Sequence, residues 1–437
     1  MARLTRVAWQ NSLLVASLII GGPTGLHGQV SVRRLLREVN TIQAAGQSEV
    51  TAISHVRLID GRGGPPIEDA TVVVRGDRIV AVGPSATTRI PPGAEPIDGQ
   101  GKSLLPGLID AHFHLDGDQG LPSLYLKHGV TSVRDPGAWI EAYDSVRRMT
   151  MAIPRLFLAG PHLDNPPPAY PEDSYLVRDA GEAKAAVDRF VDQGASVIKV
   201  YFRLPLGLLK AATEAAHARG VPVTAHLEIV DATDAIRAGV DGIEHITSLG
   251  TALLPPRDAE RYRQAIFADN NARRDGRYRV WASLDLDGPR AASVLRLAKS
   301  HSVFLSPTLA VFEKRSGDAE TTETQVAGFA RMMRFAGMAK KAGARIVVGS
   351  HSSVPHAERG WAYQREMELL VESGLTPMEA IVAGTLENAR FFRVAERLGS
   401  IEIGKQADLL LVEGQPDHEI TAMRKIGGVM LSGKWIE

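Results

Sequence analysis

Short apolar segments alternate with longer helical segments through the middle of the chain. Eight of them have the composition of buried strands: GLIDAHFHL (107–115), VTSVRD (130–135), RLFLAG (155–160), SVIKVY (196–201), VPVTAH (221–226), DGIEHI (241–246), SVFLSP (302–307) and ARIVVGS (344–350). Helical patterns lie between or after them, for example at 180–193, 208–219 and 366–373. Eight such units over roughly 290 residues predict an α/β fold, a parallel (β/α)8 TIM barrel with insertions. Its catalytic face should lie at the carboxyl ends of the strands.

The two flanks of this region have a different pattern. Short alternating pieces rich in β-formers, separated by Gly, Pro and Asp turns, occupy residues 50–103 and recur in the last forty or so residues. A chain of 437 residues also exceeds the roughly 250–300 residues at which a single core stops growing. We therefore predict a barrel domain at 106–395 and one small β-sandwich domain built from residues 29–105 and 396–437.

The first residues have the pattern of an export signal. Arg3 and Arg6 precede the apolar stretch SLLVASLIIGG. Residues 26–28, which end in a small residue, would form the cleavage site of a signal peptide of residues 1–28. The alternative is an uncleaved anchor, but the run is shorter than the roughly 20 apolar residues that span a bilayer. We therefore expect a periplasmic or secreted protein without a stable membrane anchor.

Charge and cysteine content narrow the choice of partners. Lys plus Arg and Asp plus Glu both total 50, and no basic stripe stands out, which argues against nucleic acid. A small molecule or short peptide fits better. The chain has no cysteine, so neither a disulfide framework nor thiol chemistry is available.

Five of the 13 histidines fall at or just past the ends of four predicted strands, where barrel enzymes place their ligands; they are His112, His114, His226, His245 and His351. A single strand-end histidine is more often structural than a ligand. Residues two apart in a strand point to the same side, so His112 and His114 can bind one ion. Imidazole is a natural ligand for zinc and similar metals. The convergence predicts a metal centre.

Three charged residues on these strands have a less certain role. Asp110 shares a face with His112 and could ligate or orient an imidazole ring. Glu244 should point away and be structural. Lys199, in an apolar strand, is costly to bury. It could form an ion pair inside the barrel, or be carboxylated to a carbamate that bridges two metals.

Several motifs together resemble the amidohydrolase superfamily, in its branch of imidazolonepropionase-like and prolidase-like metal hydrolases. They are PGLIDAHFH, GVTSVRD, VIKVY, TAH, GIEH, GLTPMEAIVAGTLENAR and LGSIEIGKQADLLLV, and the resemblance covers nearly the whole chain after the predicted signal peptide. The resemblance implies two divalent ions, expected to be zinc and about 3.5–4 Å apart, that hold a bridging hydroxide. It implies that His112 and His114 bind the first ion, His226 and His245 the second, and that carboxylated Lys199 bridges them.

One position departs from the family pattern. Strand eight of such proteins ends in G-T-D or G-S-D, whereas VVGSHSS places His351 where the aspartate binds metal and moves the proton. His351 could ligate the first ion and so raise the charge of the site. It could instead act directly as general acid and base. The third reading is loss of catalysis, with His356 and Glu358 as partial substitutes.

Substrate-binding candidates are fewer. Tyr201, two residues beyond Lys199, could hydrogen-bond a substrate carbonyl or simply fill the barrel. Arg134 could bind a substrate carboxylate or form a structural ion pair with Asp135 or another acid. His162 opens a Pro-rich segment, 162–175, that could form a wall of the pocket. A charged insertion at 251–278 should lie over the rim or at a homo-oligomer contact.

The sequence thus predicts an exported, metal-dependent hydrolase that cleaves an amide-like C–N bond in a dipeptide, an N-acyl amino acid or a similar small molecule. The alternative is a binding protein of the same fold whose catalysis is impaired, because His351 replaces the strand-eight aspartate.

Overall fold

A computed structural model of the chain describes residues 38–437. The predicted signal peptide, residues 1–28, lies outside the described residues. None of the helices in the described part of the chain has the length and apolar character needed to cross a membrane.

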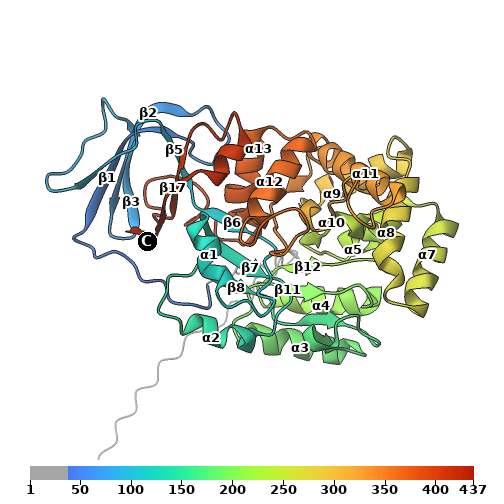
Figure 1. Ribbon diagram of the computed structural model, residues 1–437. Coiled ribbons are helices and arrows are strands. Elements are labelled where there is room, and N and C mark those ends of the chain that lie inside the picture. Colours follow the sequence, from blue (N-terminus) through green and yellow to red (C-terminus); the bar gives the residue numbers. More distant parts are fainter. Residues whose placement is uncertain (1–37) are drawn as a thin grey trace, which may run out of the picture. The chain divides into compact units, whose positions relative to one another are not determined.

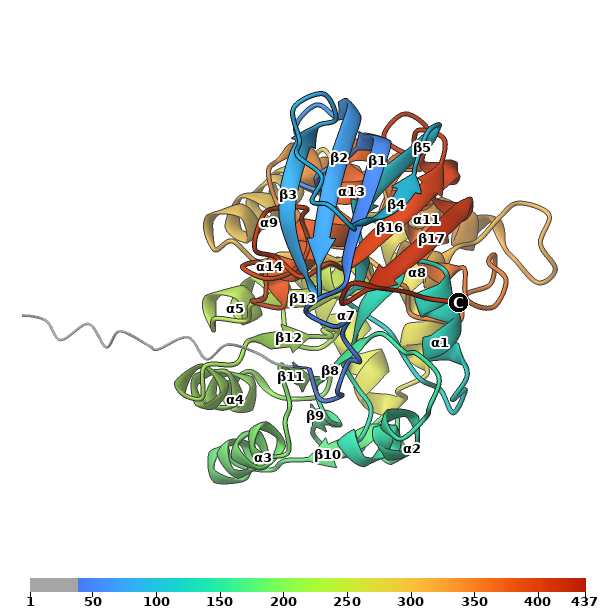
Figure 2. The same ribbon diagram turned by 90° about the vertical axis from the view of Figure 1, so that its left-hand side faces the viewer.

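Strands from both flanks of the chain lie in one eight-stranded sheet (Figure 2), in which blue strands from the N-terminal side stand beside red strands from the C-terminal side. The order is β18-β17-β16-β5-β1-β2-β3, and β4 pairs with β1. The bounds are β1 Val50–Leu58, β2 Ile67–Arg75, β3 Arg78–Pro84, β4 Glu95–Asp98, β5 Lys102–Pro106, β16 Leu409–Glu413, β17 Ile426–Leu431 and β18 Lys434–Trp435. That this sheet belongs to a β-sandwich stays a prediction.

Parallel strands form two further sheets between these flanks. One has the order β6-β7-β8 and the other β10-β9-β11-β12-β13-β14-β15. The bounds are β6 Leu108–Asp110, β7 Val130–Asp135, β8 Arg155–Leu158, β9 His162–Asp164, β10 Ser174–Leu176, β11 Ile198–Val200, β12 Val223–Ala225, β13 Gly242–Glu244, β14 Phe304–Ser306 and β15 Arg345–Ile346. Each of the eight predicted segments contains one strand. The additional β9 and β10 arise in the Pro-rich segment for which no strand was predicted.

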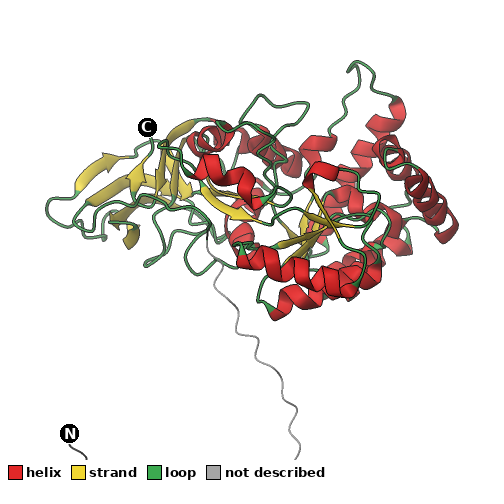
Figure 3. Ribbon diagram, turned by 90° about the horizontal axis from the view of Figure 1, so that it is seen from below, coloured by secondary structure: helices red, strands yellow, loops and turns green. Residues whose placement is uncertain are grey.

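Helices follow most of the parallel strands, which confirms the predicted α/β class, and Figure 1 and Figure 3 show them packed around those strands. They are α1 Leu121–Lys127, α2 Asp144–Arg147, α3 Ala180–Asp192, α4 Leu206–Ala218, α5 Ala232–Arg237, α6 Gly250–Leu253, α7 Pro256–Ala268, α8 Ala272–Ser283, α9 Pro289–Ser300, α10 Leu309–Phe312, α11 Glu323–Lys341, α12 Ala362–Glu372, α13 Pro377–Val382 and α14 Asn388–Phe391. Local signals set some boundaries: the Asp179 carboxylate accepts a hydrogen bond from the backbone N–H of Glu182 at the start of α3.

Backbone hydrogen bonds also join the two parallel sheets at two places. The N–H of Ala111, just after β6, donates to the carbonyl of Val348, just after β15, at 2.9 Å, which brings the ends of the first and last predicted strands together. The N–H of Ser196, just before β11, donates to the carbonyl of Leu158 in β8, at 2.8 Å, which joins the third and fourth predicted strands. The closed barrel itself stays a prediction.

Side chains of β16 show how the mixed sheet packs. Leu409 and Leu411 belong to an apolar cluster within that sheet, whereas Leu410 and Val412 belong to the large core around the parallel strands. This alternation follows from the two-residue period of a strand. One face of the sheet is therefore buried against the part of the molecule that carries the histidines.

Candidate functional site

Three histidine rings converge beyond the ends of β6 and β15. One ring nitrogen of each of His112, His114 and His351 lies within 4.8 Å of those of the other two. The Nε2 atoms of His112 and His114 are 3.0 Å apart, and the ring of His351 stacks on that of His112 with 5.3 Å between centroids. Two nitrogens that bind one tetrahedral zinc ion at about 2.0–2.1 Å stand roughly 3.3 Å apart. The cluster could therefore hold one metal ion.

A tight turn directs the His351 ring toward this cluster. Both His351 and Ser352 have left-handed backbone, with φ of 60° and 61°. The Asp110 carboxylate holds the preceding residue, because it accepts hydrogen bonds from the N–H of Ser350 at 2.9 Å and from its hydroxyl at 2.5 Å. The same carboxylate accepts from the backbone N–H of His112 at 2.9 Å. Asp110 therefore binds backbone and a hydroxyl, and neither of its two predicted roles, ligand or partner of an imidazole ring, is what the structure has.

Two other carboxylates orient the histidine rings. Glu244 Oε2 lies 2.8 Å from Nδ1 of His112, and Asp135 Oδ1 lies 3.3 Å from Nδ1 of His114. Such contacts fix the tautomer and orientation of a ligating imidazole. The prediction that Glu244 points away was wrong. Strand β13 ends at Glu244, and the left-handed backbone of His245, φ 62°, turns the next side chain back toward the site.

His226, His245 and Lys199 form a second group beside the first. The rings of His226 and His245 are 4.5 Å apart between centroids, and His245 lies 4.6 Å from His112 in the same measure. Both ring nitrogens of His226 are buried and have no hydrogen-bond partner in the described chain. Nε2 of His226 lies 3.7 Å from Oε1 of Glu228, beyond hydrogen-bond distance. Buried nitrogens without a hydrogen bond are costly, so they fit ligands of an ion. Nδ1 of His245 is 2.7 Å from the hydroxyl of Thr308, which fixes that ring.

Lys199 is only 2% exposed and lies against the same cavity. No carboxylate of the described residues lies within the 4.0 Å of an ion pair, so the predicted alternative of an ion pair inside the barrel is not present. Burial lowers the pKa of its amine to about 8. Carbon dioxide reacts with a neutral amine, so the larger neutral fraction of the Lys199 amine favours its carboxylation.

Arg134 forms the structural ion pair that was its alternative role. It is 1% exposed, and its guanidinium donates to Glu244 at 2.7 Å and to the carbonyl of Ala111 at 3.0 Å. The ring of Phe391 covers it at 4.0 Å from the centroid. Arg134 does not line the cavity, so its predicted contact with a substrate carboxylate was wrong, whereas the predicted ion pair is present with Glu244 rather than Asp135 as the acid.

Tyr201 and His162 do lie together in the cavity wall. Their rings stack with 4.2 Å between centroids, and Tyr201 also meets the edge of His226 at 4.7 Å. Burial raises the pKa of Tyr201 well above its ordinary value, so its hydroxyl remains a donor. Burial, followed by the charge of Lys199, lowers the pKa of His162 well below its ordinary value. Nδ1 of His162 has no hydrogen-bond partner in the described chain.

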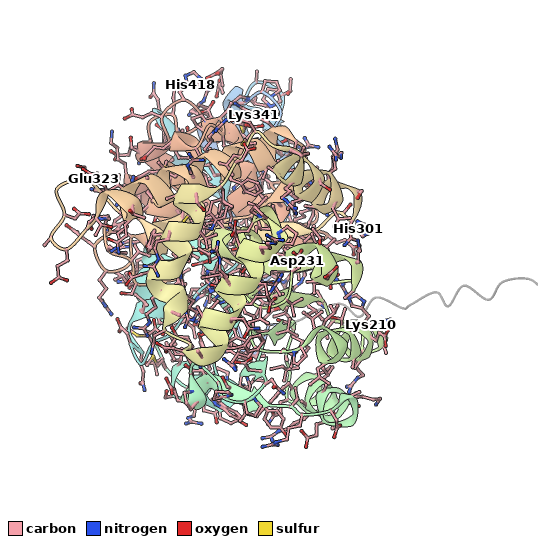
Figure 4. All side chains as sticks on the ribbon, turned by 90° about the vertical axis from the view of Figure 1, so that its right-hand side faces the viewer. Lys210, Asp231, His301, Glu323, Lys341 and His418 are labelled. Carbon is pink, nitrogen blue, oxygen red and sulfur yellow. The ribbon has the colours of Figure 1, made fainter. Side chains whose placement is uncertain are left out.

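The two groups of histidines lie in one cavity of about 760 Å3. The Pro-rich segment contributes His162, Tyr170 and Asp173 to its wall. The charged insertion contributes Arg273 and other residues of α8, in agreement with the predicted position over the rim. In Figure 4 the yellow helices of this insertion face the viewer. A cavity of this size accommodates a small molecule or a short peptide.

Sequence reasoning missed three residues of this site. Asp135 ends strand two, so the strand-end rule that found the histidines would also have found it. Glu244 was misplaced because strand alternation was carried past the end of β13. Arg273 lies in an insertion, where nothing in the sequence shows which of several arginines faces inward.

Comparison with known proteins now adds to this geometry. The family model described as "Amidohydrolase family" matches residues 103–436, most of the chain. The chain belongs to the amidohydrolase family. The resemblance inferred from the motifs is thereby confirmed. Among curated amidohydrolase relatives, the N-acyl-D-aspartate deacylase of Alcaligenes xylosoxydans xylosoxydans is 32% identical over 214 residues, 47% of this chain and 38% of the deacylase. The chain spans about half the length of the curated relatives it matches, or less.

Solved structures share the amidohydrolase fold over nearly the whole chain. A putative prolidase from Bifidobacterium longum is 26% identical, with a TM-score of 0.68 over 90% of this chain and 95% of that one. A Xaa-Pro dipeptidase with bound methionine is 23% identical, with a TM-score of 0.69 over 89% of this chain and 100% of that one. Both matches cover far more of the chain than the histidine cluster.

His351, the residue that departs from the family pattern, lies in the histidine cluster of this amidohydrolase. Burial, followed by the charge of His114, lowers the pKa of His351 to about 3, so the ring is neutral and can bind a cation. The two candidate substitutes do not reach the site. His356 pairs with Asp318 at 3.1 Å, and neither it nor Glu358 lines the cavity.

Proposed function

We propose that the protein is an exported, metal-dependent hydrolase that cleaves an amide-like C–N bond in a dipeptide, an N-acyl amino acid or a similar small molecule. The observation that carries the proposal is the convergence of His112, His114 and His351 in a cavity that also holds Lys199 and Tyr201. The names of the relatives, a deacylase and a dipeptidase, support the type of bond. Export rests on the sequence of residues 1–28 alone.

The proposal includes a closed (β/α)8 barrel of β6–β8 and β11–β15, with the mixed sheet forming a β-sandwich. Support comes from two hydrogen bonds that join the two parallel sheets, Ala111 to Val348 and Ser196 to Leu158. In a closed barrel the carboxyl ends of all eight strands surround one site, which explains why histidines from distant segments meet.

Two divalent ions, zinc in this proposal, fit the donors that the chain offers. His112, His114 and His351 would hold the first, His226 and His245 the second, and carboxylated Lys199 would bridge them. The orphaned nitrogens of His226 and the buried, unpaired amine of Lys199 support this assignment. Bound ions of this kind activate water and polarise a carbonyl group.

The residues of the chain itself then position the substrate. The protonated hydroxyl of Tyr201 donates a hydrogen bond to the substrate carbonyl oxygen, and this bond strengthens as negative charge develops there. Water adds to the carbonyl carbon, the C–N bond breaks, and the departing nitrogen takes up the proton that the water loses. His351 would serve as a metal ligand rather than as the proton donor, because its ring belongs to the cluster with His112 and His114.

Metal content and turnover test the proposal together. Protein purified without chelator should contain two ions per chain by inductively coupled plasma mass spectrometry. A panel of dipeptides and N-acyl amino acids in both enantiomers should then reveal turnover. Replacement of His114, Lys199 or His226 by alanine should abolish it.

The matched control is His301→Ala. His301 lies at the surface at the end of α9 (Figure 4), away from the cavity, so its loss should leave metal content and turnover unchanged. A wild-type protein that binds no metal and hydrolyses nothing in the panel would refute the proposal. The alternative of an impaired binding protein is not favoured by the family match or by the relatives.

A further inference from the structure

Arg273 is a buried cation without an acidic partner, and it faces the cavity from the insertion. It lies in α8 and is only 4% exposed, yet it lines the same cavity as the histidines. Its Nε has no hydrogen-bond partner, and no carboxylate of the described chain forms an ion pair with it. The rings of Phe202 and Tyr170 lie 5.0 and 5.4 Å from its guanidinium carbon.

This burial has an energetic consequence. A buried guanidinium that lacks an anion loses hydration that aromatic contacts replace only in part. Planar, two-pronged donors of this kind match a carboxylate better than any other side chain does. A negatively charged group in the cavity would therefore complete the contacts of Arg273.

Several charged side chains surround Arg273. Arg274, Arg277 and Lys314 line the same cavity, and its acidic lining residues are Asp116, Asp135, Asp173 and Asp275. The charge of Arg273 also lowers the pKa values of the buried acids Asp164 and Glu228, although burial raises both overall. Burial raises the pKa of the nearby Tyr170, but the charge of Arg273 and its hydrogen bond to the phenol lower that pKa overall.

Arg277 adds a second cation that is only weakly paired. Its guanidinium lies 3.9 Å from the buried carboxylate of Glu228, at the limit of an ion pair, and its carbon lies 5.1 Å from the centre of the Phe312 ring. Its Nε donates to the backbone carbonyl of Arg273 at 3.0 Å, which ties the two arginines together.

A short series of ring contacts connects this wall to the histidines. The ring of Tyr170, against Arg273, lies 6.2 Å from that of Tyr201, which in turn lies 4.7 Å from that of His226. We propose that Arg273, supported by Arg277, binds a carboxylate of the substrate while Tyr201 faces the bond to be cleaved. The inference rests on the proposed function and narrows it to anionic amides, such as dipeptides or N-acyl amino acids with a free carboxylate.

Matched pairs of compounds test this inference. Each carboxylate compound of the panel, for example N-acetyl-leucine in either enantiomer, is compared with its neutral carboxamide. In wild-type protein kcat/KM should be higher for the carboxylate. Arg273→Gln should reduce it roughly 10- to 100-fold for the carboxylate, the range for a lost hydrogen bond to a charged group, and about 2-fold or less for the carboxamide.

Two further variants separate recognition from folding. Arg273→Lys keeps the charge but loses the planar fork, so it should fall between wild type and Arg273→Gln. Arg279→Gln removes an exposed arginine of the same helix that does not line the cavity, and it should behave as wild type. Circular dichroism of each variant checks that the protein remains folded. If Arg273→Gln unfolds, Arg277→Gln should show a smaller loss of kcat/KM that is again confined to the carboxylates.

The outcomes distinguish the inference from the proposed function. Turnover that ignores the substrate carboxylate, or that Arg273→Gln reduces equally for both members of a pair, would keep the hydrolase and overturn the inference. If nothing is hydrolysed, the same pairs are titrated calorimetrically. Carboxylate-dependent binding that Arg273→Gln abolishes would support the inference and reject the hydrolase, whereas its absence in the wild type would overturn the inference.

Discussion

The Glu244→Gln variant tests how much the contacts of Glu244 stabilise the centre of the site. The Glu244 carboxylate is fully buried and lies at hydrogen-bond distance from Arg134, His112 and Thr224, at 2.7, 2.8 and 2.5 Å. Glutamine keeps the shape of the side chain but removes its charge and one acceptor oxygen. Its amide group would then face a donor, either the guanidinium of Arg134 or the ring nitrogen of His112.

The expected loss of stability comes from the buried charge of Arg134, which the variant leaves without its anion. Arg134 stays buried, at 1% exposed, and its aromatic neighbour Phe391 offers no anion. Breaking a buried ion pair by removing one partner costs about 3–5 kcal/mol of the free energy of unfolding. Replacing the other partner as well, in Arg134→Met with Glu244→Gln, removes the stranded charge. The double variant should therefore be at least about 1–2 kcal/mol more stable than the sum of the two single changes predicts.

Urea unfolding of the metal-free protein, followed by circular dichroism, measures these free energies without a contribution from bound ions. Lys184→Ala is the control, because its pair with Asp188 is 69% and 34% exposed and should contribute less than about 1 kcal/mol. In metal-loaded protein, Glu244→Gln should also weaken metal binding roughly 10- to 100-fold, because His112 loses its orienting partner. A loss below about 1 kcal/mol for Glu244→Gln, or strictly additive single changes, would refute the reasoning.

Four further perturbations test other parts of the molecule. His351→Asp adds an anion to the cluster and should tighten metal binding about tenfold or more; equal metal loss from both proteins during dialysis against chelator would contradict this. Lys199→Ala should reduce the metal content from two ions to about one by mass spectrometry, since the bridge is gone; two retained ions would argue against a carbamate. Tyr201→Phe should lower kcat by about 100-fold with little change in KM, as for other donors to a developing oxyanion, and an unchanged kcat would remove this role. The pKa of Glu38 is about 2, because its ion pairs with Arg397 and Arg155 outweigh the effect of burial. At neutral pH the free energy of unfolding in urea should therefore be about 2–3 kcal/mol higher for wild type than for Glu38→Gln. This difference should disappear as pH falls from about 4.5 to 2, because the carboxylate becomes protonated.

The sequence alone predicted the strands and the residues that end them. Short apolar segments could be read without tertiary information because parallel strands are buried on both faces. Their ends located His112, His114 and His351, which the structure brings together. Helix positions were right because their apolar spacing is local, although α12 begins four residues before the predicted start.

The errors arose where the backbone leaves regular geometry. Alternation along β13 was extended to His245, but its positive φ places both Glu244 and His245 toward the interior. Arg134 was interpreted either as a substrate contact or as part of a structural ion pair with Asp135 or another acid; the acid that it contacts, Glu244, is 110 residues away in the sequence. Contacts between distant segments of this kind are set by the packing of the whole sheet rather than by local sequence.

The substitution at position 351 changes the charge of the site more than its set of donors. A neutral imidazole can supply one nitrogen where the family pattern has a carboxylate, so the number of groups around the first ion need not change. The lost negative charge is not restored by Glu244, because Arg134 already balances it at 2.7 Å. Asp135 is different: it is buried, contacts the ring of His114 and has no arginine or lysine ion pair in the described chain. Its charge therefore acts on the cluster through His114, so Asp135 and the proposed carbamate of Lys199 would both supply negative charge to an ion held by three histidines.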